Sequence, residues 1–165
     1  MKIKLTPELS YIIGLWRKTK TIEGIGVRGD DILLEVFSME VLNQELTTTD
    51  KLLTEHGRVF FYHSSYRKFF QQIEKEQLER FKYLNEYAAN YLAGLFDATG
   101  TIDEKGIVSI GNLSYQDQML LLRLGFILRK REMRYIFERP VVFLTFIKKY
   151  VKIKKKHKVF DYIKS

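Results

Sequence analysis

The chain has 165 residues, of which 45% are hydrophobic and none is cysteine, and its formal net charge is +8 at pH 7. These values allow one or two small hydrophobic cores, and they exclude disulfide bonds and thiolate metal sites. The three histidines lack metal-ligand spacing, which argues against a histidine-built zinc site. We recognise no signal peptide and no run of 18 apolar residues, so we expect a soluble, intracellular, cytoplasmic protein with no membrane partner.

The positive charge is concentrated near the C-terminus. Residues 129–165 hold thirteen of the 28 Lys and Arg residues but only three of the 20 Asp and Glu residues. A segregated basic segment predicts a polyanionic partner, and the interleaved Tyr and Phe residues favour nucleic acid over a membrane surface. A solvated, solubilising tail is the alternative explanation.

The first half of the chain begins with a predicted helix over residues 7–19, because Thr6 can cap the helix and Pro7 suits its first turn. The next apolar pattern predicts a β-hairpin with strands at residues 21–27 and 32–37 about a turn at 28–30. Further on we predict a helix over residues 39–46 capped by Ser38, a hairpin over residues 51–62 that turns at His56-Gly57, and a long amphipathic helix from residue 64 or 65.

The second half repeats this order. A predicted helix over residues 86–99 is followed by strands at 101–103 and 107–110 about a turn at 103–106. The remaining predictions are a helix over residues 115–130 capped by Ser114, strands at 133–137 and 141–146 about Arg139-Pro140, and a C-terminal helix from residue 147.

Letters repeat between the two halves at a fixed offset. YLAGLF at residues 91–96 matches YIIGLW at 11–16, and TID at 101–103 matches TIE at 21–23, each pair 80 residues apart. Such a duplication predicts one compact α+β unit over residues 1–165, made of two pseudo-symmetric αββαββα repeats, about 6–85 and about 86–165.

Nine residues, LAGLFDATG at 92–100, closely resemble the LAGLIDADG signature of homing endonucleases and related intron maturases. The resemblance implies the single-chain, two-motif form of that family, with a degenerate first motif, and an intron-associated gene. It implies saddle-shaped antiparallel sheets that pack on helices and face nucleic acid. In that family the two motif helices pack along small residues, which here are Gly14, Gly94 and Ala93.

The resemblance also implies where a metal site would lie. In active members, one Asp from each motif binds a divalent metal such as Mg²⁺, which activates water for cleavage. Thr19 and Thr99 occupy the equivalent positions, and a neutral hydroxyl is a poor ligand. We therefore expect no metal, no cofactor and deficient cleavage. Asp97, Asp103 and Glu23 are the substitute carboxylates if the chain is instead an active endonuclease that uses Mg²⁺.

The first motif gains three cations, Arg17, Lys18 and Lys20. Their charge can serve either to bind phosphate or to stabilise the helix ends, and the sequence leaves both roles open.

Nucleic-acid contacts are expected at two kinds of position. By resemblance, an alternating array of Lys152, Lys154 and Lys156 approaches the DNA backbone, and Lys75 is the counterpart of Lys154 in the first half. Base reading in the family comes from the strands, for which the candidates are Arg28, Ser109, Asn112, Arg58, Arg134 and Arg139.

These observations favour a monomeric protein that binds double-stranded DNA without efficient cleavage. Three alternatives remain: an active homing endonuclease that makes double-strand breaks, a maturase-like protein that binds structured RNA, and a protein-interaction module without nucleic acid.

Overall fold

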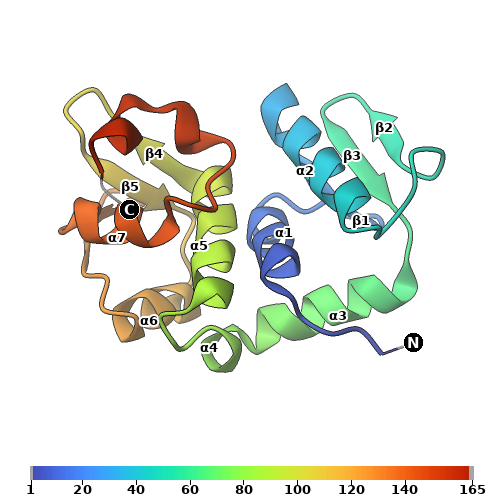
Figure 1. Ribbon diagram of the computed structural model, residues 1–165, viewed down its shortest axis with the longest axis horizontal. Helices are drawn as coiled ribbons and strands as arrows, with labels where there is room; N and C mark the ends of the chain where they lie inside the picture. The colour runs from blue at the N-terminus through green and yellow to red at the C-terminus, as the bar shows by residue number, and fades with distance from the viewer. Residues whose placement is uncertain (1, 164–165) are drawn as a thin grey trace.

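The computed structural model describes residues 2–163 and contains two antiparallel sheets that pack on helices. Helices α1 (Pro7–Arg17) and α5 (Glu86–Thr99) lie side by side in the middle of the molecule, with one sheet on either side of them (Figure 1). The strand order is β1-β3-β2 in one sheet and β4-β5-β7-β6 in the other. This arrangement confirms the predicted α+β class.

The remaining elements follow in chain order. The first half contains β1 (Ile25–Arg28), α2 (Asp31–Asn43), β2 (Leu53–Glu55), β3 (Arg58–Phe61), α3 (Ser64–Lys75) and α4 (Gln77–Arg80). The second half contains β4 (Gly100–Ile102), β5 (Val108–Gly111), α6 (Tyr115–Arg123), β6 (Leu128–Arg131), β7 (Arg134–Phe137), α7 (Pro140–Ile147) and the short 3₁₀ helices η1 (Lys154–Lys156) and η2 (Lys158–Tyr162).

Several predicted elements are confirmed together with their local causes. The side chain of Thr6 accepts a hydrogen bond from the Leu9 N–H at 3.1 Å, and α1 starts at Pro7 as expected. Helix α5 has its predicted bounds, with Asn85 as the cap. The hairpin β2–β3 turns at His56-Gly57, and α3 starts at Ser64.

The prediction of a strand at residues 32–37 is wrong, and so is the predicted helix start at residue 39. Both regions belong to α2, which starts at Asp31. The Asp30 carboxylate accepts a hydrogen bond from Leu33 N at 3.0 Å, so Asp30 caps a helix. Leu33, Phe37 and Val41 are the buried residues of α2, and their spacing of four is helical.

As a consequence the first sheet has three strands where four were predicted. β1 is an edge strand of this sheet, and on its free side an isolated bridge joins Lys20 to Val27 in place of a fourth strand. The first half therefore has the order αβαββαα, whereas the second half has the predicted order αββαββα followed by η1 and η2.

The end of the chain also differs from the prediction. Helix α6 stops at Arg123 because Gly125 adopts φ +90°, and the predicted helical residues 128–130 lie in β6. Residues 141–146, predicted as a strand, lie in α7, which carries Pro140 in its first turn. The predicted C-terminal helix from residue 147 is replaced by η1 and η2.

The contact between α1 and α5 depends on two glycines. A Cβ added at Gly14 would lie 2.1 Å from the backbone oxygen of Tyr91, and one added at Gly94 would lie 2.2 Å from that of Tyr11. The contact is reciprocal at the offset of 80 residues seen in the sequence. Each glycine therefore lets the other helix's backbone approach, as the resemblance implied. The repeat boundaries themselves stay a prediction.

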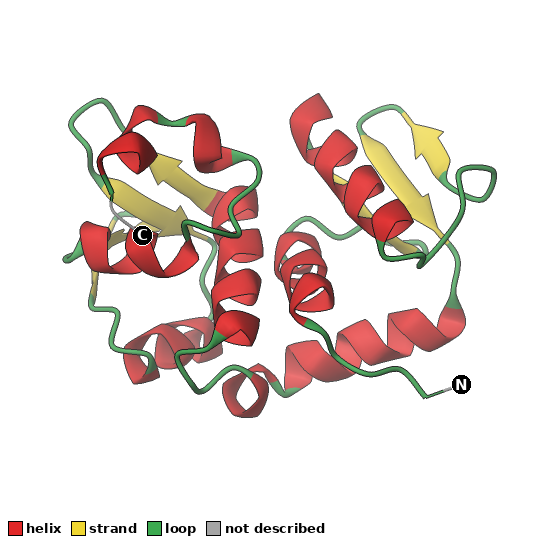
Figure 2. Ribbon diagram, viewed as in Figure 1, coloured by secondary structure: helices red, strands yellow, loops and turns green. Residues whose placement is uncertain are grey.

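One continuous hydrophobic core contains buried residues from both halves, including α1, α5, both sheets and the C-terminal segment. Figure 2 shows α2 in front of one sheet and α7 with the C-terminal segment in front of the other, so the opposite face of each sheet points away from the viewer. Within residues 2–163, no helix combines the length and apolar character needed to cross a membrane.

Candidate nucleic-acid interface

The helix-free face of the first sheet carries two arginines. Ile25 and Val27 of β1 are buried in the core, and successive strand side chains alternate between faces. Arg28 therefore lies on the opposite face, which we call the outward face. The strand register pairs Arg28 directly with Arg58 of β3, so these two predicted base-reading residues are neighbours although they lie in separate strands.

The outward face of the second sheet carries three arginines. Phe137 and Ile110 are buried in the core, and by alternation Arg129, Arg131 and Arg134 lie on the other face. Arg131 is paired directly with Arg134 across β6 and β7. Arg129 and Arg131 are not among the predicted base-reading residues, because Arg129 falls at the end of the helix predicted over 115–130 and Arg131 falls between that helix and the strand predicted at 133–137.

Both sheets thus place two arginines directly opposite each other on the outward face. Like charges in this position destabilise a pair of strands unless something neutralises them. In the first sheet Arg58 also binds Glu55, with Nε 2.9 Å from the carboxylate, so part of that charge is neutralised. On β6, Arg129 and Arg131 are exposed. The outward faces are therefore suited to a polyanion.

Arg134 has a structural duty in addition to its charge. Its Nη2 donates to the backbone oxygen of Thr99 at 2.8 Å and to the hydroxyl of Thr101 at 2.9 Å, while its Nε donates to Ser109 at 2.9 Å. The guanidinium thus sits on the C-terminal end of α5, where a cation is favourable. The Ser109 hydroxyl, a predicted base-reading group, accepts this hydrogen bond from Arg134.

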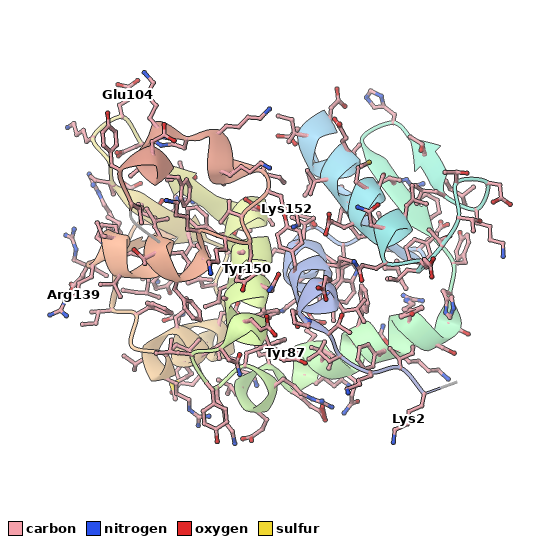
Figure 3. All side chains as sticks on the ribbon, viewed as in Figure 1. Lys2, Tyr87, Glu104, Arg139, Tyr150 and Lys152 are labelled. Atoms are coloured by element: carbon pink, nitrogen blue, oxygen red, sulfur yellow. The ribbon has the colours of Figure 1, made fainter. Side chains whose placement is uncertain are left out.

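The other predicted base-reading residues lie outside the strands. Asn112 follows β5 with φ +58°, and Arg139 precedes α7. Figure 3 shows Arg139 at the outer edge of the molecule.

The two threonines at the predicted metal positions are equivalent in structure. The Thr19 hydroxyl donates to the Leu15 oxygen at 2.8 Å, and the Thr99 hydroxyl donates to the Leu95 oxygen at 2.9 Å. Each hydroxyl therefore donates its hydrogen to a backbone oxygen of the preceding helical turn. Thr19 and Thr99 carry no carboxylate, Glu74 and Asp117 beside α1 are bound by Arg17, Lys18 and Lys20, and Arg134 brings positive charge to Thr99, so these residues do not fit a divalent metal ion.

The three substitute carboxylates are bound in local structure at separate places. Asp97 is buried and accepts hydrogen bonds from four donors. Asp103 accepts from the N–H groups of Lys105 and Ile107 in the β4–β5 turn, and Glu23 accepts from the Tyr62 hydroxyl at 2.8 Å. Among residues 2–163, no three or more His, Asp or Glu side chains gather as a metal-ion cluster.

The basic C-terminal segment lies on the helix-covered side of the second sheet. Val151 and Phe160 are buried in the core, on the face opposite Arg131 and Arg134. Lys152 reaches the middle of the molecule (Figure 3), where its Nζ lies 3.8 Å from Glu40 and 4.8 Å from the Tyr11 ring centre.

Lys154 is half-buried, whereas Lys156 and Lys75 are exposed. The phosphate contacts of these lysines and of Lys152 stay a prediction. Lys152, Lys154 and Lys156 lie on the side of the second sheet opposite its outward arginines.

Asp97 anchors this segment to α5. Its carboxylate accepts from the backbone N–H groups of Lys152, Ile153 and Lys154 at 2.8, 3.1 and 2.9 Å, and from the Tyr11 hydroxyl at 2.6 Å.

We expect Asp97→Asn to weaken this anchor, because a neutral amide accepts hydrogen bonds less strongly than a carboxylate. Amide hydrogen exchange of residues 152–154 should become at least about tenfold faster. The exposed Asp161→Asn is the matched control and should leave those rates unchanged. Unchanged exchange in Asp97→Asn would contradict the anchor.

Arg17 occupies the position equivalent to Asp97 and forms a buried polar network. It donates to the Tyr91 hydroxyl at 2.9 Å and to Gln77 at 3.2 Å, and it forms an ion pair with Asp117 of α6. Its Nε lies 3.2 Å from Glu74. The network therefore joins α1 of the first half to α5 and α6 of the second. Burial opposes the charge of Arg17, but Tyr91 and Asp117 raise the pKa of its guanidinium above the usual value.

No protein-family model matches the chain, and no curated protein matches it either. Solved structures do. The chain is similar to the crystal structure of I-DmoI in complex with DNA and Ca, with a TM-score of 0.61 and 13% identity over 94% of this chain and 97% of that chain. It is also similar to I-DmoI in complex with DNA and Mn, with a TM-score of 0.58 and 12% identity over 86% of this chain and 96% of that chain.

Mesophilic variants of the homing endonuclease I-DmoI give a TM-score of 0.59 at 12% identity, over 86% of this chain and 95% of that chain. I-DmoI is a single-chain LAGLIDADG homing endonuclease, so the chain has a LAGLIDADG-like fold at low sequence identity.

Proposed function

We propose that this protein binds double-stranded DNA through the outward faces of its two sheets and does not cleave it with a metal ion. The observation that supports binding most directly is the pair of directly opposed arginines on each outward face. Two of the similar structures of I-DmoI reported above are complexes with DNA, which agrees with the same use of the fold here. Both faces belong to one chain, so we propose that it binds as a monomer.

The proposed loss of cleavage is supported by the ends of α1 and α5. Both threonine hydroxyls donate to their own helices, and the carboxylates of Asp97, Asp103 and Glu23 are occupied elsewhere. The I-DmoI complexes contain Mn or Ca, whereas the threonine hydroxyls at these helix ends are poor ligands for such ions.

The binding surface is tested by the salt dependence of affinity for a random-sequence duplex. Each phosphate contact contributes about 0.9 to the slope of log affinity against log salt concentration. The double variant Arg129→Gln/Arg131→Gln should therefore lower the slope by about 2. Arg80→Gln/Lys82→Gln removes the same charge on and after α4 and should change the slope little. Equal slopes for the native protein and the Arg129→Gln/Arg131→Gln variant would contradict the proposal that the outward face of the second sheet binds the duplex.

Two further measurements separate the alternatives. Calorimetry with Mn²⁺ should show no binding to the native protein, with or without duplex, and a supercoiled plasmid carrying random inserts should stay uncut with Mg²⁺ or Mn²⁺. Cutting would establish the active endonuclease. Tighter binding to structured RNA than to the duplex, at the same salt concentration, would favour the maturase-like alternative.

A further inference from the structure

An open hollow of about 530 Å³ lies at the C-terminal end of α1. Three separate segments form it: the residues after α1, the end of β1 and the β2–β3 turn. Its lining consists of Lys18, Thr19, Lys20, Arg28, Gly29, His56 and Gly57. The lining contains no carboxylate, although the hollow includes Thr19, the position where the family's metal-binding Asp would stand.

The charges around the hollow do not balance. Lys18 Nζ lies 2.8 Å from Asp117, and Lys20 Nζ lies 2.8 Å from Glu74. Arg17 also binds both of these carboxylates. Three cations therefore share two carboxylates, and Arg28 adds a further positive charge at the rim. The hollow has a net positive charge.

The walls are held together by the backbone. The Thr19 oxygen accepts from Arg28 N at 2.7 Å, and Gly29 N donates to the Gly57 oxygen at 3.1 Å. These bonds join the end of α1 to β1, and β1 to the β2–β3 turn. A Cβ added at Gly57 would meet nothing within 4 Å, so the space beside Gly57 is open to a ligand close to the backbone, whereas the space beside Gly29 is filled by Leu33. Lys20 is 42% exposed and lies over the Trp16 ring at 4.7 Å, so its ammonium group has access to the opening.

A tetrahedral oxyanion suits this combination better than a cation. Arg28 offers a planar fork of N–H donors, and His56 offers a ring nitrogen donor. The partly exposed Lys20 offers an ammonium group that it shares with Glu74, whereas the Lys18 ammonium is held by Asp117. We propose that the hollow at the end of α1 binds a phosphate group without a metal ion. The nucleic-acid backbone is one source of that group, and this part rests on the proposed function; free phosphate is the other.

Inorganic phosphate tests the site alone. At constant ionic strength, phosphate but not chloride should shift the backbone amide signals of Gly29 and Gly57. It should also change the fluorescence of Trp16, the chain's single tryptophan. Arg28→Gln should weaken phosphate binding by about tenfold, because one charge-assisted contact is lost. Lys20→Gln should act in the same direction, and both residues are exposed, so the fold should persist.

The control is Lys2→Gln. Figure 3 shows Lys2 at the lower edge of the molecule, beyond α3. This variant should bind phosphate like the native protein. If phosphate shifts the two glycine amides no more than chloride does, or if Arg28→Gln binds as tightly as Lys2→Gln, the proposal is overturned.

Duplex DNA then identifies the source of the phosphate. Arg28 also lies on the outward face, so Lys20→Gln is the variant for this step: if it lowers the salt slope of duplex binding by about 1, the hollow takes a phosphate of the backbone. If the slope is unchanged while inorganic phosphate binding is lost, the site stands and its ligand is free phosphate. If the native protein binds inorganic phosphate but no duplex, the phosphate site is supported and the proposed DNA-binding function is contradicted.

Discussion

Gly94→Ala is expected to lower the free energy of unfolding by about 3 kcal/mol. Alanine favours a helix over glycine by about 1 kcal/mol, so the expected sign is opposite to the helix preference. The new Cβ would lie 2.2 Å from the Tyr11 oxygen and 2.7 Å from the Leu15 nitrogen. Both are backbone atoms, so no side-chain rotation relieves the clash and α1 must move away from α5. Chemical denaturation measures the loss.

Two other glycines complete the design of this experiment. Gly14→Ala should be as damaging, because its Cβ would lie 2.1 Å from the Tyr91 oxygen. Gly57→Ala meets nothing within 4 Å and has φ +75°, so only backbone strain of about 1 kcal/mol is expected. A Gly94→Ala protein as stable as the native one would contradict the close contact of the two helices.

Gly14 and Gly94 also show what the sequence could predict. Their equivalence was visible because the letters around them repeat at one offset, and the helix interface follows from that repeat. The bounds of α5 were predictable because Asn85 supplies a local cap and the apolar pattern runs without interruption. Local signals of this kind depend on few residues, so the sequence contains them completely.

The wrong predictions come from short apolar runs whose partner is distant. Residues 32–37 and 141–146 are dense in Val, Leu, Ile and Phe, and such runs suit a buried strand or a buried helix equally. The structure makes both helical. Asp30 and Pro140 are the deciding signals, because each residue type suits a turn and also suits the start of a helix.

The candidate interface was only partly predictable for a similar reason. Arg28, Arg58 and Arg134 were selected by residue type, but their opposition across strands depends on the register of residues far apart in the chain. Arg129 lies in a segment for which a helix to residue 130 is predicted, and Arg131 falls between that helix and the strand predicted at 133–137. The duty of Arg17 also needed the structure, because its partners lie on α3, α4, α5 and α6.

Asp117→Asn is expected to cost about 4 kcal/mol of stability. The Asp117 carboxylate is only 1% exposed, and it faces Arg17 and Lys18 across the contact between the two halves. Removal of its charge leaves two cations without their shared partner in a buried place. It also weakens the cap of α6, where Asp117 accepts from Ser114 N at 2.8 Å. Thermal and chemical denaturation measure the effect.

The pH dependence of stability gives this prediction a second readout. Burial alone would raise the pKa of Asp117, but Arg17, Lys18 and Ser114 overcome it and lower the pKa from 3.8 to about 2. The folded protein therefore holds this carboxylate ionised more strongly than the unfolded chain does. The resulting stability, about 2 kcal/mol, is fully present above about pH 4 and is lost as the pH falls towards 2.

The difference in stability between the native protein and Asp117→Asn should therefore shrink by about 2 kcal/mol as the pH is lowered from 4 to 2, because protonation removes the charge that the substitution also removes. Asp31→Asn is the matched control, since Asp31 is an exposed carboxylate in the first turn of α2 and should cost only a few tenths of a kcal/mol. A constant difference between the native protein and Asp117→Asn across that pH range would show that the carboxylate's charge is not what Arg17 and Lys18 recognise. The ion pairs of Asp117 would then add nothing to the contact between the two halves.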